Sequence, residues 1–261
     1  MAKVSIWQID CSDSESAAER KARVLTALPQ LLGNCDLLVL PELWLSGAFN
    51  LSGIPESADL VDSDFLSQLQ ALVDDSSAEL HAGTFPIRTV SDSARFTNTA
   101  LLFRPNQPCI SYRKQHLFGF AGGETTLMNA SNDVVVLDSA IGKSGLATCY
   151  DLRFPELFRV LVDAKADNFL IPAGWPTSRI LHWQVLLQAR AIENQAVVVG
   201  ANSCGMNGDV ELGGNSMIIS ATGEILANAG ASEEVLSTEV DLAETVKWRN
   251  DFPVLKDRRS L

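Results

Sequence analysis

The chain has 261 residues, of which 46% are hydrophobic and 20% charged, and its formal net charge is -12. This composition is that of an ordinary globular protein with enough apolar material for a core. The acidic charge argues against nucleic acid or an anionic membrane surface as a partner, and no apolar stretch approaches the roughly 20 residues that a transmembrane helix needs.

Cysteine usage and the N-terminus indicate a cytoplasmic protein. The apolar run at residues 4–9 is too short for a signal peptide. The cysteines are odd in number, widely spaced and without a C-x-x-C pair, which is not a disulfide framework. They are Cys11, Cys35, Cys109, Cys149 and Cys204.

Apolar runs and amphipathic segments predict alternating strands and helices in the first half of the chain. In chain order they are strand 4–9, helix 15–32 capped by Ser14, strand 37–40, helix 63–73 capped by Asp62 or Ser63, and strands 79–85, 97–103 and 109–112. Pro29 lies inside the first helix, which predicts a kink in the last turn or an early end.

The second half repeats this alternation. It is predicted to contain strands 133–137 and 145–149, helix 155–164, strand 168–172, helix 178–194 with Leu181, Val185, Ala189 and Ile192 at helical spacing, strand 196–201, and a paired 216–220 and 224–227. Each half would form a sheet with helices on one face, and stacking the two bare faces buries them. We therefore expect an α/β fold, a four-layer α-β-β-α sandwich, formed by residues 1–261 as a single domain without a linker.

Three apolar runs end in residues that carry chemistry. Cys149 follows residues 146–148, and Pro155 after it suits the first turn of a helix. This arrangement would place Cys149 near the positive end of a helix dipole, which favours a thiolate. Glu42 and Lys114 end two other runs. A thiol, a carboxylate and an ammonium from separate strand ends are the groups that nucleophilic acyl transfer needs.

The segments around these residues resemble the motifs of the nitrilase superfamily of carbon–nitrogen hydrolases, whose members use a Glu–Lys–Cys triad. The glutamate motif is Leu-Pro-Glu-Leu at 40–43, the lysine motif covers 112–118, and the cysteine motif covers 147–156. The three motifs occur in the family's order and span most of the chain. The family has the four-layer fold expected above.

The resemblance implies a role for each residue. Cys149 is the nucleophile, and Glu42 is the base that takes the thiol proton and later activates water. Lys114 and the backbone N–H of Tyr150 would hold the oxyanion. Many family members carry a second glutamate after the lysine motif, and Glu124 is the carboxylate between Lys114 and residue 133. The alternative for Glu124 is a solvated loop carboxylate.

Further residues are expected in or near the acyl pocket. Arg153 either binds a substrate carboxylate or anchors the start of a helix against Glu156 or another acid. Ala173 and Trp175 are expected to line the acyl site. Gly174 stands where family members acting on ω-amides often have asparagine.

The resemblance therefore implies a cofactor-independent amidase. Residues 188–195 resemble the ω-amidase branch, so an ω-amide of a dicarboxylic or α-keto acid is the first expected substrate, hydrolysed by water to a carboxylate and ammonia. The alternatives are an N-carbamoyl compound, deaminated glutathione, a nitrile, or a catalytically silent interaction protein. The dispersed histidines predict no metal site. A C-terminal arm from about residue 248 resembles the family segment that packs on a second subunit, which implies a homodimer or larger homo-oligomer.

Overall fold

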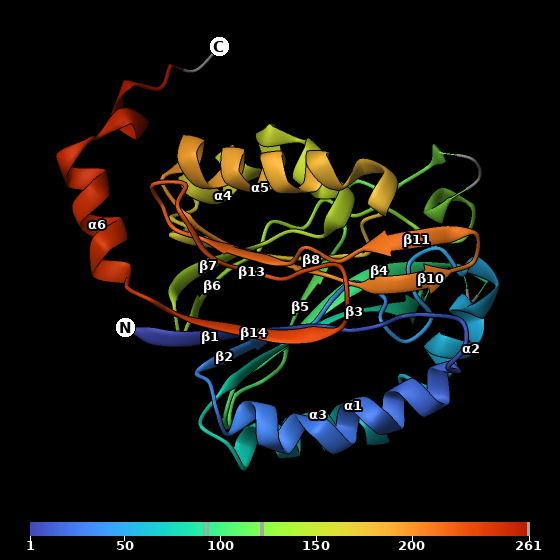
Figure 1. The fold of residues 1–261 in the computed structure, drawn as a ribbon. Helices are drawn as coiled ribbons and strands as arrows, with labels where there is room; N and C mark the ends of the chain where they lie inside the picture. Colours follow the sequence, from blue (N-terminus) through green and yellow to red (C-terminus); the bar gives the residue numbers. More distant parts are fainter. Residues whose placement is uncertain (91, 93, 121–122, 260–261) are drawn as a thin grey trace.

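The computed structural model describes residues 1–90, 92, 94–120 and 123–259, and its strands form two large sheets and a small ribbon (Figure 1). The first sheet has six strands in the order β14-β1-β2-β3-β4-β5. Strands β1, β2 and β3 are parallel to one another, and the other neighbours are antiparallel. The bounds are β1 Ala2–Gln8, β2 Leu37–Val39, β3 Glu79–Arg88, β4 Phe96–Phe103, β5 Ile110–Arg113 and β14 Glu234–Val240.

The second sheet repeats this plan, with six strands in the order β13-β12-β9-β8-β7-β6. Its central strands β7, β8 and β9 are parallel. The ribbon is an antiparallel pair of β10 and β11. The bounds are β6 Val136–Ser139, β7 Gly142–Leu146, β8 Asn168–Ala173, β9 Val197–Asn202, β10 Cys204–Asn207, β11 Val210–Gly213, β12 Met217–Ile219 and β13 Ile225–Asn228.

Helices α1 and α3 cover the outer face of the first sheet and α4 and α5 cover that of the second, which confirms the predicted four-layer sandwich (Figure 1). One apolar cluster joins α1 and α3 to the first sheet, a second lies between the sheets, and a third joins α4 and α5 to the second sheet. Over the described ranges no helix combines the length and apolarity needed to cross a membrane. The helices are α1 Ala17–Leu32, α2 Ile54–Asp59, α3 Ser63–Asp74, α4 Pro155–Asp163, α5 Ile180–Asn194 and α6 Leu242–Asp251.

The first helix begins later than expected, and its cap is Ser16, not Ser14. Only Ser16 has a glutamate at the third helical position. The Ser16 hydroxyl accepts the N–H of Glu19, and the Glu19 carboxylate accepts the N–H of Ser16, which is a capping box. Pro29 does not end the helix early, because α1 continues to Leu32. For α3, the expected cap Asp62 is confirmed.

Two strands near the predicted nucleophile are displaced from their expected positions. The sequence predicts strands at residues 133–137 and 145–149, whereas β6 covers Val136–Ser139 and β7 covers Gly142–Leu146. The two strands form a tight antiparallel hairpin, and Gly142 takes a positive φ of 88° where the chain enters β7. The prediction that a strand ends at Cys149 is therefore wrong, and β7 ends at Leu146.

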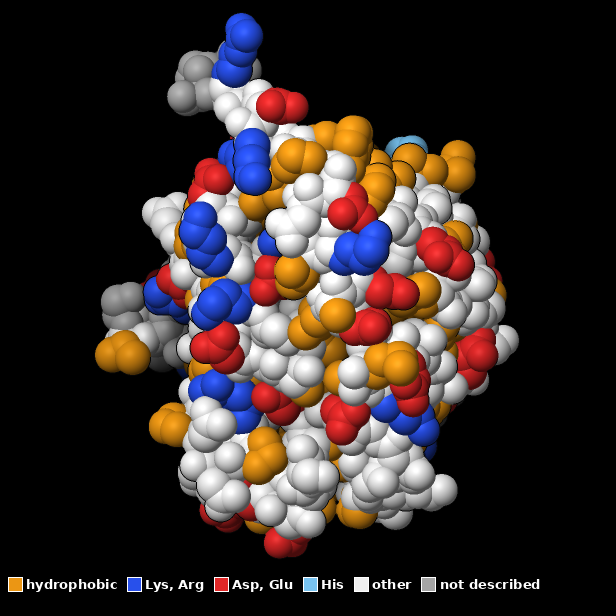
Figure 2. All heavy atoms as spheres, turned by 90° about the vertical axis from the view of Figure 1, so that its left-hand side faces the viewer, with side chains coloured by type: hydrophobic (Ala, Val, Ile, Leu, Met, Phe, Trp, Pro, Cys, Tyr) orange, Lys and Arg blue, Asp and Glu red, His pale blue; other side chains and the backbone are white. Residues whose placement is uncertain are grey.

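The apolar residues at helical spacing in α5 face outward. Leu181, Val185 and Ile192 are 66%, 54% and 55% exposed. The opposite face, with Trp183 and Leu187, packs on the second sheet. Hydrophobic side chains gather at the top of the molecule, where α4 and α5 lie, beside the projecting C-terminal arm (Figure 2).

The C-terminal arm follows β14, which returns to the first sheet and pairs with β1. The projecting segment begins with α6 at Leu242, earlier than the expected start near residue 248, and includes the 3-10 turn Val254–Asp257 (Figure 1). Arg249 ties α6 to its own chain, with Nη1 2.8 Å from Oδ1 of Asp167.

Candidate active site

The residues expected at strand ends meet in one cavity. Glu42 lies just beyond β2, Lys114 directly follows β5, and Cys149 opens the 3-10 turn Cys149–Arg153 after β7. Together with Glu124 they line a cavity of about 320 Å³. The structure therefore brings together the four residues that sequence analysis assigned to the chemistry.

Lys114 lies buried between two carboxylates. Its Nζ is 2.7 Å from Oε1 of Glu42 and 2.7 Å from Oε2 of Glu124. Burial alone would lower the pKa of Lys114, but the charges of Glu124, Glu42 and Cys149 raise that pKa well above its usual value. The ammonium is therefore held in its charged form, as an oxyanion site requires.

Glu124 is not a solvated loop carboxylate. Its side chain is buried, and Oε2 also accepts the backbone N–H of Phe118 at 2.8 Å. Burial raises the pKa of Glu124, and the adjacent Lys114 ammonium opposes that rise. Glu124 thus connects the lysine to the loop that carries Phe118, which is another residue lining the cavity.

Asn98 was missed by sequence analysis and bridges the two glutamates. It lies in β4, and its Nδ2 donates to Oε1 of Glu42 at 2.8 Å and to Oε1 of Glu124 at 2.7 Å. An amide with two N–H donors suits two carboxylates that also share one lysine. The available signal was an amide side chain within a strand whose other residues are apolar or threonine.

Glu42 is buried and held from both sides. Oε1 accepts Lys114 and Asn98, while Oε2 accepts the backbone N–H of Gly174 at 2.9 Å. A Cβ added at Gly174 would lie 2.3 Å from Cβ of Ala48. The glycine that departs from the family pattern therefore lets the chain pack closely against Ala48.

Cys149 adopts a left-handed backbone conformation with φ of 46°, a strained geometry for a residue other than glycine and one typical of functional sites. Burial raises the pKa of the Cys149 thiol well above its usual range, and the charge of Glu42 raises it further, while the charge of Lys114 opposes the rise. Cys149 opens the 3-10 turn Cys149–Arg153, and α4 begins only at Pro155, so the cysteine does not lie directly at the start of the α-helix as expected. A neutral thiol next to a carboxylate calls for base-assisted attack.

Asp151 holds the cysteine turn against the lysine strand and was not singled out from the sequence. It is fully buried, and Oδ2 accepts the backbone N–H of Thr148 at 2.9 Å and the hydroxyl of Tyr112 at 2.7 Å. Its Oδ1 accepts the backbone N–H of His116 at 2.9 Å. Since Tyr112 and His116 flank Lys114, the Asp151 carboxylate positions both the lysine motif and the cysteine motif.

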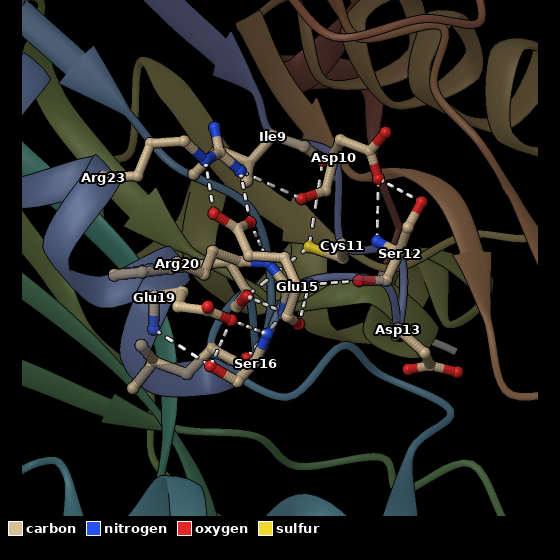
Figure 3. Close-up of polar contacts among 12 residues, drawn as sticks. Ile9, Asp10, Cys11, Ser12, Asp13, Glu15, Ser16, Glu19, Arg20 and Arg23 are labelled. Carbon is tan, nitrogen blue, oxygen red and sulfur yellow. Dashed lines mark hydrogen bonds and ion pairs between the residues drawn. The ribbon is translucent and has the colours of Figure 1, made fainter.

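The buried Arg20, drawn with Glu15 and Arg23 in Figure 3, also fixes the loop after Glu42. Arg20 of α1 donates from Nη1 to the carbonyl oxygen of Leu45 at 2.7 Å. Its Nε lies 3.2 Å from the carboxylate of Glu15, which also pairs with Arg23. This network joins α1 to the segment that leads away from the candidate base.

The cavity is also lined by Tyr150, Arg153 and Trp175, together with Arg179. The Arg153 guanidinium carbon lies 4.7 Å from the centroid of the Trp175 ring. No carboxylate in the described part of the chain pairs with Arg153, so the structure does not support the alternative of an anchor to Glu156.

Ala173 does not line the cavity, which corrects the expectation for that residue. It ends β8 and is fully buried in the cluster beneath α4 and α5. The following Gly174 and Trp175 line the cavity in its place, because the chain turns at the strand end. Among the described residues, no group of three or more His, Cys, Asp or Glu side chains is placed to hold a metal ion.

Comparison with known proteins connects this geometry to a family. A carbon–nitrogen hydrolase family model matches residues 4–250. The chain is 40% identical to a 2-oxoglutaramate amidase of Paenarthrobacter nicotinovorans, over 98% of this chain and 89% of the relative. It is 37% identical to omega-amidase YafV of Escherichia coli strain K12, over 85% of this chain and 84% of the relative.

A solved structure agrees with these relatives. It is XC1258 from Xanthomonas campestris, a CN-hydrolase superfamily protein with an arsenic adduct in its active site. The alignment covers 100% of this chain and 98% of that one, with a TM-score of 0.89 and 27% sequence identity.

Proposed function

The chain belongs to the carbon–nitrogen hydrolase family, and on that premise we propose that it is an amidase that hydrolyses ω-amides through a thioester at Cys149. The family resemblance inferred from the three motifs, including its ω-amidase branch, is confirmed by these relatives. One observation carries the mechanism: Cys149, Glu42 and Lys114 line the same cavity, with Nζ of Lys114 2.7 Å from Oε1 of Glu42.

In the first half-reaction, Glu42 takes the thiol proton as Sγ of Cys149 forms a bond to the amide carbonyl carbon. The carbonyl oxygen becomes negative and is stabilised by the Lys114 ammonium and the backbone N–H of Tyr150. When this intermediate collapses, the C–N bond breaks and Glu42 returns its proton to the leaving nitrogen. Ammonia departs, and the acyl group remains on Cys149 as a thioester.

In the second half-reaction, Glu42 takes a proton from water, and the hydroxide attacks the thioester carbonyl. The same cation and N–H hold the second oxyanion. The C–S bond then breaks, the carboxylic acid is released, and the sulfur recovers its proton from Glu42. Glu124 and Asn98 position Lys114 and Glu42 through the contacts described above. We propose that no metal or other cofactor takes part.

The substrate is an ω-amide of a dicarboxylic or α-keto acid. Two relatives that align along most of this chain are named for 2-oxoglutaramate and for ω-amides. The test is ammonia release from 2-oxoglutaramate and succinamate, compared with an N-carbamoyl amino acid, a deaminated glutathione and an aliphatic nitrile. We expect the two ω-amides to be hydrolysed fastest, with activity unchanged by a chelator. Turnover of a carbamoyl compound or nitrile without turnover of either ω-amide would contradict the proposal.

We further propose that residues 1–261 act as one cytoplasmic domain that forms a homodimer. In support, β14 from the end of the chain completes the first sheet beside β1, and each of the five cysteines is a free thiol. The exposed apolar face of α5 beside the arm offers surface for a second copy (Figure 2).

Light scattering after size exclusion tests the assembly. We expect a dimer mass for the natural chain and a monomer for Val185→Glu, which places a charge on the exposed face of α5. Met206→Glu, at an exposed methionine of β10, is the matched control and should remain dimeric. A monomeric natural chain would contradict the assembly without affecting the amidase assignment.

A further inference from the structure

Two guanidinium groups lie at the mouth of the cavity on different elements. Arg153 ends the 3-10 turn that begins with Cys149, and Arg179 ends the 3-10 turn Thr177–Arg179 that leads into α5. The Arg179 guanidinium carbon is 5.5 Å from the centroid of the Phe118 ring, while Arg153 lies over Trp175. Each arginine is half-buried and stacked on an aromatic ring of the cavity wall, which orients its planar fork.

These two positive charges have no carboxylate partner in the described part of the chain. The carboxylates that line the cavity, Glu42 and Glu124, are already engaged with Lys114 and Asn98. Burial lowers the pKa of Arg153, and the charge of Arg179 lowers it further. Two like charges thus line one cavity, in a chain whose net charge is -12.

A bound anion would compensate the positive charge of these two guanidinium groups. The buried end of the cavity holds one ammonium and two carboxylates, and its mouth adds two guanidinium groups. The cavity as a whole therefore carries an excess of positive charge that one carboxylate would neutralise. An ω-amide of a dicarboxylic or keto acid carries its amide at one end and that carboxylate at the other.

We propose that Arg179 is a specificity-determining residue that, together with Arg153, binds the free carboxylate of the substrate while the amide reaches Cys149. This inference rests on the proposed amidase function and deepens it, because it assigns the recognition of the charged end to a pair of arginines on two separate turns. A guanidinium binds a carboxylate with directed, charge-assisted hydrogen bonds, so the pair selects charged amides over neutral ones.

The test compares two substrates of the same chain length, succinamate and its methyl ester, by ammonia release. In Arg179→Met we expect kcat/KM for succinamate to fall about tenfold to a hundredfold, mainly through KM, since a charge-assisted contact is lost. The methyl ester should change by less than about threefold, because it has no charge to lose. Arg179→Lys keeps the charge without the fork, and its KM should lie between those of the other two enzymes.

A control variant and a binding measurement distinguish failure of the carboxylate-binding role from failure of the amidase function. Arg258→Met removes a positive charge from the C-terminal arm, where Arg258 pairs with Asp163 at 2.8 Å, and should leave both substrates unaffected. If Arg179→Met impairs both substrates equally, or neither, the carboxylate-binding role is wrong while the amidase function stands. If the natural chain releases ammonia from neither substrate, the amidase function fails.

The binding role can still be decided in that case. Calorimetric binding of succinamate to Cys149→Ala, with and without Arg179→Met, measures recognition without turnover. Weaker binding in the double variant by about tenfold or more supports the arginine pair. Equal binding by the two proteins overturns it.

Discussion

The ammonium nitrogen of Lys114 lies 2.7 Å from a carboxylate oxygen of Glu42, in a contact that is buried on both sides. In the proposed mechanism one partner moves protons and the other steadies the oxyanion, so the contact links the base to the electrostatic site. Glu124 approaches the same nitrogen from another element. Each of these three residues can therefore be changed with a distinct, measurable consequence.

Replacing Cys149 with alanine should abolish turnover and leave the fold intact. The substitution removes one sulfur atom from the cavity wall and keeps a side chain with the same backbone preferences. Ammonia release should fall to background, while the circular dichroism spectrum and thermal midpoint stay close to those of the natural chain. Cys109→Ala is the matched control, because Cys109 is exposed and lies outside the cavity. Residual turnover in Cys149→Ala would refute the nucleophile assignment.

Glu42→Gln and Glu124→Gln remove the same charge from opposite sides of Lys114, so their comparison isolates the base. In Glu42→Gln, neither the thiol nor water has a base, but the thiol is the stronger nucleophile and still attacks slowly. Hydrolysis of the thioester is slowed more, so an acyl-enzyme should accumulate as activity falls about a thousandfold. In Glu124→Gln, Lys114 is held less firmly in both half-reactions, so activity should fall about a hundredfold without an adduct. Intact-protein mass spectrometry after mixing with succinamate distinguishes the two. An adduct on Glu124→Gln alone would reverse the roles.

Lys114→Met should destabilise the fold as well as remove activity. It leaves the buried Glu42 and Glu124 carboxylates without their shared cation, and breaking a buried ion pair typically costs about 3–5 kcal/mol in the free energy of unfolding. Urea unfolding measures the loss. The double variant Lys114→Met/Glu124→Gln should recover part of it, because one uncompensated charge is removed. A loss below about 1 kcal/mol would mean that the network behaves like a surface pair.

Acid should destabilise the protein through His81. This residue of β3 is fully buried, and burial lowers its pKa from 6.5 to about 4. The unfolded chain therefore binds the proton first as pH falls. The contribution of neutral His81 to the free energy of unfolding is fully present above pH 6.5 and is lost as the pH falls through 4. The total loss is about 3 kcal/mol.

Urea unfolding of the natural chain and His81→Gln at pH 7 and pH 4.5 checks this sign. The variant should be the less stable protein at pH 7, since it loses packing and the contact between Nδ1 and the N–H of Gly83. It should nevertheless lose less stability on acidification than the natural chain. Equal losses in the two proteins would show that His81 is not the group that titrates.

Periodicity predicted the layered architecture, and the resemblance of three motifs to those of a known family predicted that Glu42, Lys114 and Cys149 form one site. The layers follow from a local pattern, because apolar runs form buried strands. Glu42 and Lys114 follow strands of the first sheet and Cys149 follows a strand of the second, so their meeting also depends on how the two sheets stack. The same local signals led to errors of a few residues where a hairpin turn, and not hydrophobicity, set the bounds, as at β6 and β7.

Only the tertiary structure decided which face of a helix packs inward and which polar groups form hydrogen bonds or ion pairs with one another. The apolar residues at helical spacing in α5 lie outside, because the face with Trp183 fits the second sheet. Asn98 and Arg179 gain their proposed roles from segments distant in sequence. The sequence of a single strand or turn does not reveal these neighbours. The charges and hydrogen bonds of a site depend on all the segments that form it.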